Sequence, residues 1–362
     1  MITKQSLIKV LAVCLVLAAG LAASVQPACS RVVQPSQSTP QPDPKFSVTV
    51  YDPARVSAGT TLVRDNTDEA NPRVVELNML GEVVWEYRIP QELRGYTNPG
   101  FDAEALDNGN MLLGFPRYGI MEIDRSGNMI WSYRDTKVTH DADRLANGNT
   151  LMVFGGNDTQ DDAQVKEVDP QGNLVWQWFA RDHFDYAPYD RVWESGWTHT
   201  NAATRLANGN TLISLRNFNF LVMVSPDGQV VQTIGQGLIF SPHDPEVLEN
   251  GNILVASQPP LPGYLEWPDD AEIIEAREIN PATNQVVWQY GGIGSSWRGQ
   301  LTRDANRLAN GNTLITGHSK VIEVTPGGEV VWQLELNADL GEGNDKAARG
   351  FYKAQRIPAG AN

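Results

Sequence analysis

Short stretches of alternating apolar and polar residues recur along the chain beyond residue 46. Many follow an Asn-Gly-Asn triplet, as in "NGNTLMVF" and "NGNTLISL", and an apolar residue stands two positions before the triplet. Alternation with a period of two is typical of β-strands, and Asn-Gly supplies the positive φ that tight hairpins need. The pattern therefore predicts a hairpin at each of the triplets 108–110, 147–149, 208–210, 250–252 and 310–312.

A second kind of hairpin alternates with these triplets and ends in a strand that carries Trp, as in "KEVDPQGNLVWQW". It occurs in six copies, and in the fourth copy Gln232 replaces the Trp. The other copies end at Trp85, Trp131, Trp176, Trp288 and Trp332. Because large aromatic side chains are usually buried, each Trp is predicted to pack between neighbouring units.

The two hairpins together give four short strands per unit, which predicts an all-β, six-bladed β-propeller over residues 47–362. The last strand, "YKAQRIP" at 352–358, aligns with the first strand of the other units, and the first unit lacks such a strand. The C-terminal strand is therefore expected to close the ring as the inner strand of the first blade. Seven blades is the alternative, because "YDPARVSAG" at 51–59 can also be read as an inner strand.

The residues before the propeller indicate export. Lys4 and Lys9 precede the apolar run "VLAVCLVLAAGLAASV", so residues 1–28 are predicted to be a signal peptide. Residues 29–46, rich in Pro, Ser and Gln, are predicted to be a flexible linker. The protein is then expected in the periplasm or outside the cell. A membrane tether through the N-terminus, by lipidation of Cys29 or by a retained leader, is left open.

The net charge and the cysteine content limit the partners and the reactions that this protein can have. The formal net charge of −15 and the lack of clustered Lys and Arg argue against nucleic acid as a partner. An anionic substrate would therefore need a local positive pocket. Both cysteines, Cys14 and Cys29, lie before the propeller, which excludes thiol catalysis and disulfides there. The oligomeric state is open, and a homodimer is one expectation.

Four of the five histidines fall where predicted strands meet one face of the propeller. When the inner strands are aligned on the apolar residue before each turn, a single position holds, in blade order, Phe101, His140, Asn201, His243, Arg303 and Tyr352. His199 lies two residues before Asn201, and the second strands reach the same face at Arg216, Gln258 and His318. Because the inner strands of a propeller line its central channel, these side chains are predicted to converge at one mouth.

Two long insertions, residues 180–197 and 259–272, join strands at this same face, and long loops on a rigid scaffold often carry function. His183 lies in the first insertion. An Asp follows the aligned position in four blades, at Asp102, Asp141, Asp244 and Asp304. These aspartates are interpreted mainly as turn or inter-blade hydrogen-bonding residues, and orientation of a neighbouring imidazole is the alternative.

At this point the sequence resembles the arylsulfate sulfotransferase family of exported six-bladed propellers, over nearly the whole mature chain. "VDPQGNLVWQWFARDHF", "WTHTNAATRL", "SLRNF" and "SPHDPEVL" resemble segments of that family in the expected order. The resemblance implies transfer of a sulfuryl group from one phenol to another without a nucleotide sulfate donor (PAPS). It also implies a transient sulfohistidine at His243, with His140, His199, Asn201 and Arg216 as the other polar active-site positions. The cysteine pair found near the site in some members is missing.

These assignments are chemically coherent. A neutral imidazole is a competent nucleophile, and the permanently charged guanidinium of Arg216 suits the oxygens of a transferring sulfuryl group. His140 or His199 is expected to act as general acid and base. Further substrate-binding candidates at the mouth are Asn201, Arg303, His318 and Trp197, although Arg303 and His318 match no family role. The expected partners are small phenolic sulfates and phenols.

Three other interpretations of the sequence stay open. A quinoprotein-like propeller could serve as a non-catalytic binding or assembly module, because fold does not settle function. His140, His199, His243 and an Asp could hold a divalent ion, although their spacing is no local metal motif and Arg216 disfavours a cation. A quinone cofactor would suit the Trp hairpins, but dedicated ligands are missing from the sequence. No cofactor and no metal are therefore expected.

Overall fold

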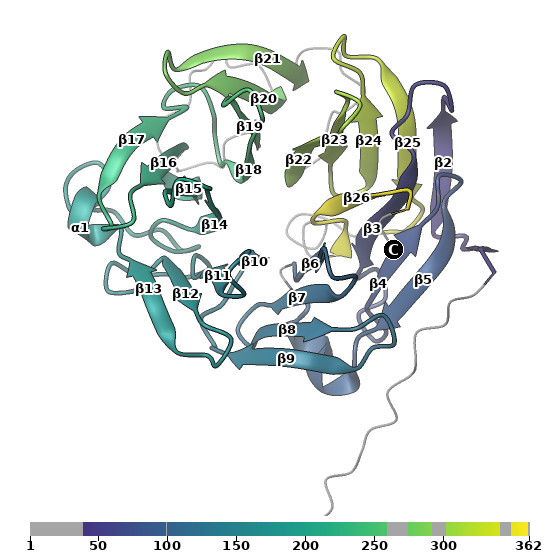
Figure 1. The fold of residues 1–362 in the computed structure, drawn as a ribbon, viewed down its shortest axis with the longest axis horizontal. Coiled ribbons are helices and arrows are strands. Elements are labelled where there is room, and N and C mark those ends of the chain that lie inside the picture. The colour runs from purple at the N-terminus through teal and green to yellow at the C-terminus, as the bar shows by residue number, and fades with distance from the viewer. Residues whose placement is uncertain (1–38, 99, 259–273, 292–301, 341–348, 361–362) are drawn as a thin grey trace, which may run out of the picture. The chain divides into compact units, whose positions relative to one another are not determined.

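The computed structural model describes residues 39–98, 100–258, 274–291, 302–340 and 349–360. Within these ranges the strands form six antiparallel sheets arranged around a common centre (Figure 1). The prediction of an all-β, six-bladed propeller is confirmed. The predicted signal peptide, the first ten residues of the predicted linker and the insertion at 259–272 lie outside the described residues.

Each blade runs from an inner strand at the centre to an outer strand at the rim. Blade 1 consists of β26 (Ala354–Pro358), β3 (Gly59–Asp65), β4 (Arg73–Leu77), β5 (Glu82–Arg88) and β1 (Gln41–Pro42). Blade 2 consists of β6 (Asp102–Ala105), β7 (Met111–Phe115), β8 (Gly119–Ile123) and β9 (Met129–Arg134). Blade 3 consists of β10 (Ala142–Arg144), β11 (Thr150–Val153), β12 (Val165–Val168) and β13 (Leu174–Trp178).

Blade 4 consists of β14 (Thr200–Arg205), β15 (Thr211–Leu215), β16 (Phe220–Val224) and β17 (Val230–Ile234). Blade 5 consists of β18 (His243–Val247), β19 (Ile253–Ala256), β20 (Ile274–Asn280) and β21 (Gln285–Gly291). Blade 6 consists of β22 (Asp304–Arg307), β23 (Thr313–Thr316), β24 (Lys320–Val324), β25 (Val330–Leu336) and β2 (Phe46–Tyr51). Within the described ranges, three short helical segments lie between strands, namely η1 (Gln91–Tyr96), α1 (Arg181–Phe184) and η2 (Arg216–Phe218).

The hydrophobic core is divided among the interfaces between blades. On β7, for example, Leu112 packs with blade 3 and the adjacent Leu113 packs with blade 1. Because successive side chains of a strand point to opposite faces, a middle strand that is covered on both faces can be apolar at successive positions, as β7 is. The outer strands have one face in solvent, and on β9 exposed residues alternate with half-buried ones along its second half. This difference explains why the period of two is clearest in the Trp-containing hairpins.

The ring closes through both ends of the described chain. β26 pairs antiparallel with β3, with Ala354 opposite Val63, and so supplies the inner strand of blade 1. β2 pairs with β25 and adds an outer strand to blade 6. The predicted closure by the C-terminal strand is confirmed. The alternative of seven blades is wrong, because the segment 51–59 contributes the end of an outer strand, a turn and the start of β3, and forms no inner strand.

The repeated Trp residues join each blade to the next one. Trp131, for example, donates its indole N–H to the carbonyl oxygen of Pro170, in the second hairpin turn of blade 3, at 2.9 Å. Trp332 makes the corresponding bond from blade 6 to Met79 of blade 1, at 3.0 Å, and so closes the circle. In blade 4 the amide of Gln232 donates to the carbonyl oxygen of Pro281 in the same way. The predicted position of these side chains between blades is confirmed.

Three arginines of the inner strands are used in the same interfaces. Arg144, Arg205 and Arg307 each form an ion pair at 2.8 Å with a glutamate of the preceding blade. Each guanidinium also lies over the repeated Trp of that blade, between 4.4 and 5.1 Å from the ring centroid. These arginines line the centre of the propeller, but their charges are committed to holding the blades together.

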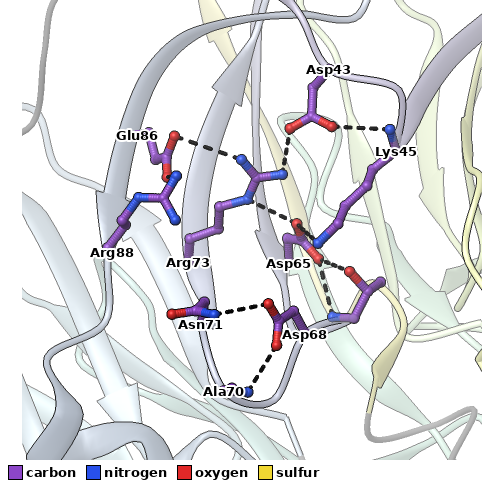
Figure 2. A network of polar contacts seen from close by, with 10 residues as sticks. Asp43, Lys45, Asp65, Asp68, Ala70, Asn71, Arg73, Glu86 and Arg88 are labelled. Carbon is purple, nitrogen blue, oxygen red and sulfur yellow. Dashed lines mark hydrogen bonds and ion pairs between the residues drawn. The ribbon is translucent and has the colours of Figure 1, made fainter.

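The segment before residue 47 is attached to the propeller by charged groups (Figure 2). The side chain of Arg73, on β4, contacts Asp43 at 2.5 Å and Asp65 at 2.8 Å, and Lys45 contacts Asp65 at 3.3 Å. Gln41 and Pro42, which the sequence places in the linker, form β1 and pair with β5. The last residues of the predicted linker are therefore part of the folded unit.

Candidate active site

The side chains that the sequence alignment placed at one position lie at the beginnings of the inner strands. His243 starts β18 and Asn201 lies in β14. Arg303 comes directly before β22, and His140 and Tyr352 each stand two residues before the start of β10 and β26. All of these strands face the centre of the propeller (Figure 1). Their starting ends therefore bring residues from five blades toward one place.

His243 is held in a single tautomer. Its side chain is only 2% exposed, and Nδ1 lies 2.7 Å from the carbonyl oxygen of Ser241. A carbonyl can only accept, so Nδ1 carries the proton and donates it. Burial, and then the charges of Arg303 and Arg216, hold the pKa of His243 well below its usual value. The ring is therefore neutral at physiological pH, and Nε2 is the unprotonated nitrogen that carries the lone pair.

Two donors face this Nε2 atom. Nη1 of Arg303 lies 3.4 Å from it and Nε2 of Gln258 lies 3.5 Å from it. The Gln258 amide is itself oriented, because its nitrogen also donates to the carbonyl oxygen of Thr302 at 2.8 Å. The main-chain N–H of Arg303 donates to Thr316 at 2.8 Å, which places this guanidinium from blade 6 next to the imidazole from blade 5.

His199 and His140 form a stacked pair beside this group. Their ring centroids are 4.9 Å apart with an interplanar angle of 28°, and the His140 ring lies 6.1 Å from that of Tyr352. Nδ1 of His199 donates to the carbonyl oxygen of Ser195 at 2.6 Å, so its Nε2 is an acceptor. Within the described residues, neither ring nitrogen of His140 has a hydrogen-bond partner.

Burial also keeps these two rings neutral. It lowers the pKa of His140 to about 3, and the charge of Arg216 acts in the same direction. The same two causes, in the same order, hold the pKa of His199 well below its usual value. The fixed positive charge of the site therefore resides on guanidinium groups, while the imidazoles supply neutral nitrogen atoms.

The backbone that carries His199 is strained and is held by a buried carboxylate. His199 has φ of 47°, in the left-handed region that a residue with a side chain rarely adopts. Asp158 accepts hydrogen bonds from the main-chain N–H of His199 at 3.1 Å and from the hydroxyl of Thr198 at 2.7 Å. Burial raises the pKa of Asp158 to about 6 in spite of these bonds.

The neighbouring Asn217 ties Arg216 to the same loop. Its Nδ2 donates to the carbonyl oxygen of Gly196 at 2.9 Å, and its Oδ1 accepts from Nη1 of Arg216 at 3.1 Å. Arg216 is 8% exposed in η2. The segments "WTHTN" (197–201) and "SLRN" (214–217) therefore form one hydrogen-bonded unit, which explains why the sequence pattern of the site includes both.

The other predicted residues have different surroundings. Asn201 donates to the carbonyl oxygen of Pro242 at 3.0 Å and so supports the backbone next to His243, while its Oδ1 has no partner among the described residues. Trp197 is fully buried in the hydrophobic cluster around Phe218 and donates to Tyr189. His318 is buried in blade 6, and its carbonyl oxygen accepts from the N–H of Phe351. Within the described residues, Trp197 thus belongs to this hydrophobic cluster and not to the histidine cluster.

The fifth histidine lies in the loop after blade 3. The ring of His183 stacks on Trp178 at 5.9 Å, and Nε2 donates to the carbonyl oxygen of Gly228 at 2.9 Å. These contacts connect α1 to blade 4. His183 therefore contributes to packing and provides a natural control for the clustered histidines.

A layer of aspartates around Lys353 lies one residue further along the inner strands than the aligned position that carries the histidines. Nζ of Lys353 lies 3.5 Å from Asp102 and 3.2 Å from Asp244, and it also bonds to Asp141. Burial alone would lower the pKa of Lys353, but the charges of these carboxylates outweigh it and raise this pKa well above the usual value. Asp141 accepts from the N–H of Ala203 in the next blade at 3.0 Å. The inter-blade interpretation of this aspartate is confirmed, whereas the lysine was not anticipated.

This Asp–Lys353 layer borders a separate cavity of about 960 Å³ on its other side. The cavity is lined by inner-strand residues, including Glu104, Asp143 and Glu246, and by none of the clustered histidines. Burial raises the pKa of Asp102 to about 7 and that of Glu104 to about 8. The aspartate layer thus separates an acidic channel from the histidine cluster.

Sequence reasoning missed four residues of this region. Gln258 and Tyr352 appeared in the aligned positions, but their residue types suggested no chemistry. The other two are Lys353 and Arg64, a buried residue of β3 whose Cζ atom lies 5.0 Å from the centroid of the Tyr352 ring. They gave no signal, because neither occupies a position that a histidine or arginine of another blade shares. Their importance follows only from the residues that surround them in the folded ring.

The described residues offer neither a candidate metal site nor a membrane-spanning helix. No group of three or more His, Cys, Asp and Glu side chains within the described ranges is arranged to hold a metal ion. None of the helices in those ranges has the length and apolar character needed to cross a bilayer.

Comparison with known proteins shows the family to which the chain belongs. The family model described as Arylsulfotransferase (ASST) matches residues 47–249, more than half of the chain. No curated protein matches the sequence significantly. A protein of unknown function from Bacteroides caccae has a similar structure, with a TM-score of 0.54 and 19% identity over 77% of this chain and 94% of that one. An inactive virginiamycin B lyase from Staphylococcus aureus, with quinupristin, has a TM-score of 0.48 and 9% identity over 79% and 87%. At 19% identity, the match to the Bacteroides caccae protein indicates the fold alone.

Proposed function

Since the chain belongs to the arylsulfotransferase family, we propose that it moves a sulfuryl group from an aryl sulfate to a phenolic acceptor through an intermediate on Nε2 of His243. The observation that carries this proposal is the tautomer of His243. Its Nδ1–H donates to the carbonyl oxygen of Ser241, and its unprotonated Nε2 faces the donors of Arg303 and Gln258. A nucleophile and donors for an oxyanion are thus combined in one place.

In the first half-reaction the Nε2 lone pair attacks sulfur, a nitrogen–sulfur bond forms, and the bond between sulfur and the aryl oxygen breaks. The bonding electrons leave with the phenolate, which takes a proton. The sulfuryl oxygens remain negatively charged, and the guanidinium of Arg303 and the amide of Gln258 are within reach of a group on Nε2. Catalysis then depends mainly on positioning and charge stabilisation, as in phosphoryl transfer.

In the second half-reaction the acceptor phenol loses its proton, its oxygen attacks sulfur, and the electrons of the nitrogen–sulfur bond return to Nε2. A neutral imidazole with an acceptor nitrogen suits the removal of this proton, and His199 presents such an atom. His140 stacks on His199 and is the other candidate. Because both imidazoles are neutral between turnovers, this proton passes on to water and the leaving phenolate of the next cycle takes one from water, so protons balance over a full turnover.

Incubation of the purified protein with p-nitrophenyl sulfate and phenol tests this function. We expect nitrophenol release that depends on phenol, formation of phenyl sulfate, and an acid-labile sulfuryl adduct on the peptide that contains His243. Release without an acceptor would indicate a sulfatase. A protein that binds aryl sulfates without any turnover would indicate the non-catalytic propeller.

The pH dependence of the first half-reaction follows from the lowered pKa of His243. An ordinary histidine with a pKa of about 6.5 would lose roughly tenfold in nucleophilic form at pH 5.5. Because the pKa of His243 lies well below that value, its neutral form persists as the pH falls. We expect kcat/KM for p-nitrophenyl sulfate to change less than about twofold between pH 8 and pH 5.5. An inflection near pH 6.5 would contradict this assignment.

A further inference from the structure

Arg64 is a buried guanidinium without a hydrogen-bond partner. It lies on β3 of blade 1 and is 2% exposed, and within the described residues none of its three side-chain nitrogens has an acceptor. Burial lowers the pKa of Arg64 to about 9, which still leaves it charged at neutral pH. An unpaired buried charge is strongly unfavourable, so folding alone gives no reason to keep an arginine here.

The repeat does not require an arginine at this position either. In each of the other five blades the corresponding residue of the second strand, identified from its pairing with the inner strand, is uncharged: Gly114, Val153, Ser214, Ala256 and Thr316. Small or neutral side chains therefore satisfy the packing of a blade at this point. Arg64 is an addition specific to blade 1.

Arg64 contacts the histidine cluster through Tyr352. Its Cζ atom lies 5.0 Å from the centroid of the Tyr352 ring and 5.7 Å from that of Phe101. Arg303, which faces Nε2 of His243, lies 5.6 Å from the same Tyr352 ring, and the His140 ring lies 6.1 Å from it. Arg64 thus joins Tyr352 as a second residue of blade 1 in the same cluster.

The nearby carboxylate of Asp102 does not pair with Arg64. Its Oδ1 accepts from the N–H of Ala103 and lies 3.5 Å from Lys353, and its Oδ2 accepts from the N–H of Ala142. Two other guanidiniums, Arg216 and Arg303, already accompany the three neutral imidazoles, whereas a sulfate monoester carries a single negative charge. The hydrogen-bonding capacity of Arg64 therefore exceeds what the reacting group needs.

We propose that Arg64 forms an anion subsite that binds a second oxyanion on the aromatic substrate, such as a ring carboxylate or a second sulfate. The inference rests on the proposed function, since the reacting sulfate is assigned to His243 and Arg303. It names the substrate class as aryl sulfates with a second negative group. In this class the planar fork of Arg64 donates two hydrogen bonds to the second group.

Binding of unreactive sulfonates tests this subsite separately from catalysis. Benzenesulfonate carries one charge, whereas 3-sulfobenzoate, 4-sulfobenzoate and 1,3-benzenedisulfonate carry two, and none can transfer its sulfuryl group. By calorimetric titration we expect the wild type to bind at least one dianion about tenfold or more tightly than benzenesulfonate. The carboxylate and disulfonate arms distinguish the two kinds of second oxyanion. In Arg64→Met the ratio should fall to about one, and Arg64→Lys should retain part of it.

Stability provides a second readout that a purely structural arginine would move in the opposite direction. Without ligand, Arg64→Met should melt at or above the temperature of the wild type, because an unpaired buried charge has been removed. Arg205→Met is the matched control. Arg205 pairs with Glu167 between blades, so its loss should lower the melting temperature and leave the binding ratio unchanged.

The two proposals can fail separately. A wild type that turns over p-nitrophenyl sulfate but binds all four sulfonates equally would overturn the Arg64 subsite and leave the transferase intact. An unchanged ratio in Arg64→Met, or a lowered melting temperature in both Arg64 variants, would also overturn it. A dianion preference that disappears in Arg64→Met, in a protein without turnover, would support the subsite and contradict the transferase.

Discussion

Replacement of His243 by alanine is expected to reduce sulfuryl transfer from p-nitrophenyl sulfate to phenol by at least about 10⁴-fold, as loss of a nucleophile does in other covalent enzymes. The variant retains Arg303 and Gln258 but has no atom on which the intermediate can form. The measurement is the steady-state rate, together with mass spectrometry of the peptide that contains residue 243. The acid-labile adduct should be absent.

His183→Ala is the matched control for this experiment. His183 is bonded to Gly228 and stacked on Trp178, and it has no contact with the clustered histidines in the described residues. Its replacement should lower the melting temperature while turnover stays within about threefold of the wild type, because packing contacts contribute to stability and not to the reaction. Transfer at a near wild-type rate by His243→Ala would disprove the sulfohistidine mechanism.

Replacement of Lys353 by methionine is expected to lower the free energy of unfolding by about 3 kcal/mol at pH 8, because removing one partner of a buried ion pair leaves the other charges uncompensated. Lys353 stands among Asp102, Asp141 and Asp244, and its side chain is 16% exposed. Chemical denaturation measures the effect. Lys320→Met is the control, since Lys320 pairs with Glu335 at 3.4 Å near the surface, where such pairs contribute about 0 to 1 kcal/mol.

The difference in the free energy of unfolding between Lys353→Met and the wild type, called the deficit below, should become smaller as the pH falls. Burial raises the folded-state pKa of Asp102 to about 7, and the charge of Lys353 now lowers it, so this pKa rises further in the variant. The folded variant then binds more protons than the folded wild type between pH 5 and pH 8, and its stability falls more steeply as the pH rises. We expect the deficit to be smaller at pH 5 than at pH 8. A deficit independent of pH would show that Lys353 acts by packing alone.

The fold could be predicted from the sequence because each blade repeats the same short-range sequence signals. Asn-Gly turns, alternating strands and a Trp in the second hairpin occur in nearly every unit, and each acts over a few residues. The two departures from the repeat could also be recognised in the sequence. Gln232 takes the place of Trp and donates to the next blade as the Trp residues do, and the missing first strand of blade 1 is supplied by the C-terminus.

The candidate site could be predicted only in part. Alignment of the inner strands placed His140, His243 and Arg303 at one level, and the structure brings them together with His199. Trp197 looked equally suitable from its position in the same loop, but it is buried in a hydrophobic cluster. A residue's distance from a turn indicates the level that it occupies in the ring. It does not indicate the direction in which the side chain points.

The sequence by itself predicted the propeller, the way in which its ring closes and the level at which the histidines lie, because these depend on hydrogen bonds and periodicities within single units. It left six and seven blades open. Only the tertiary structure decided the tautomer of His243, the approach of Arg303 and Gln258 to its Nε2, the ion pairs of Lys353 and the isolation of Arg64. Each of these arises where several blades meet, and electrostatics and burial at such a point depend on all the neighbours at once.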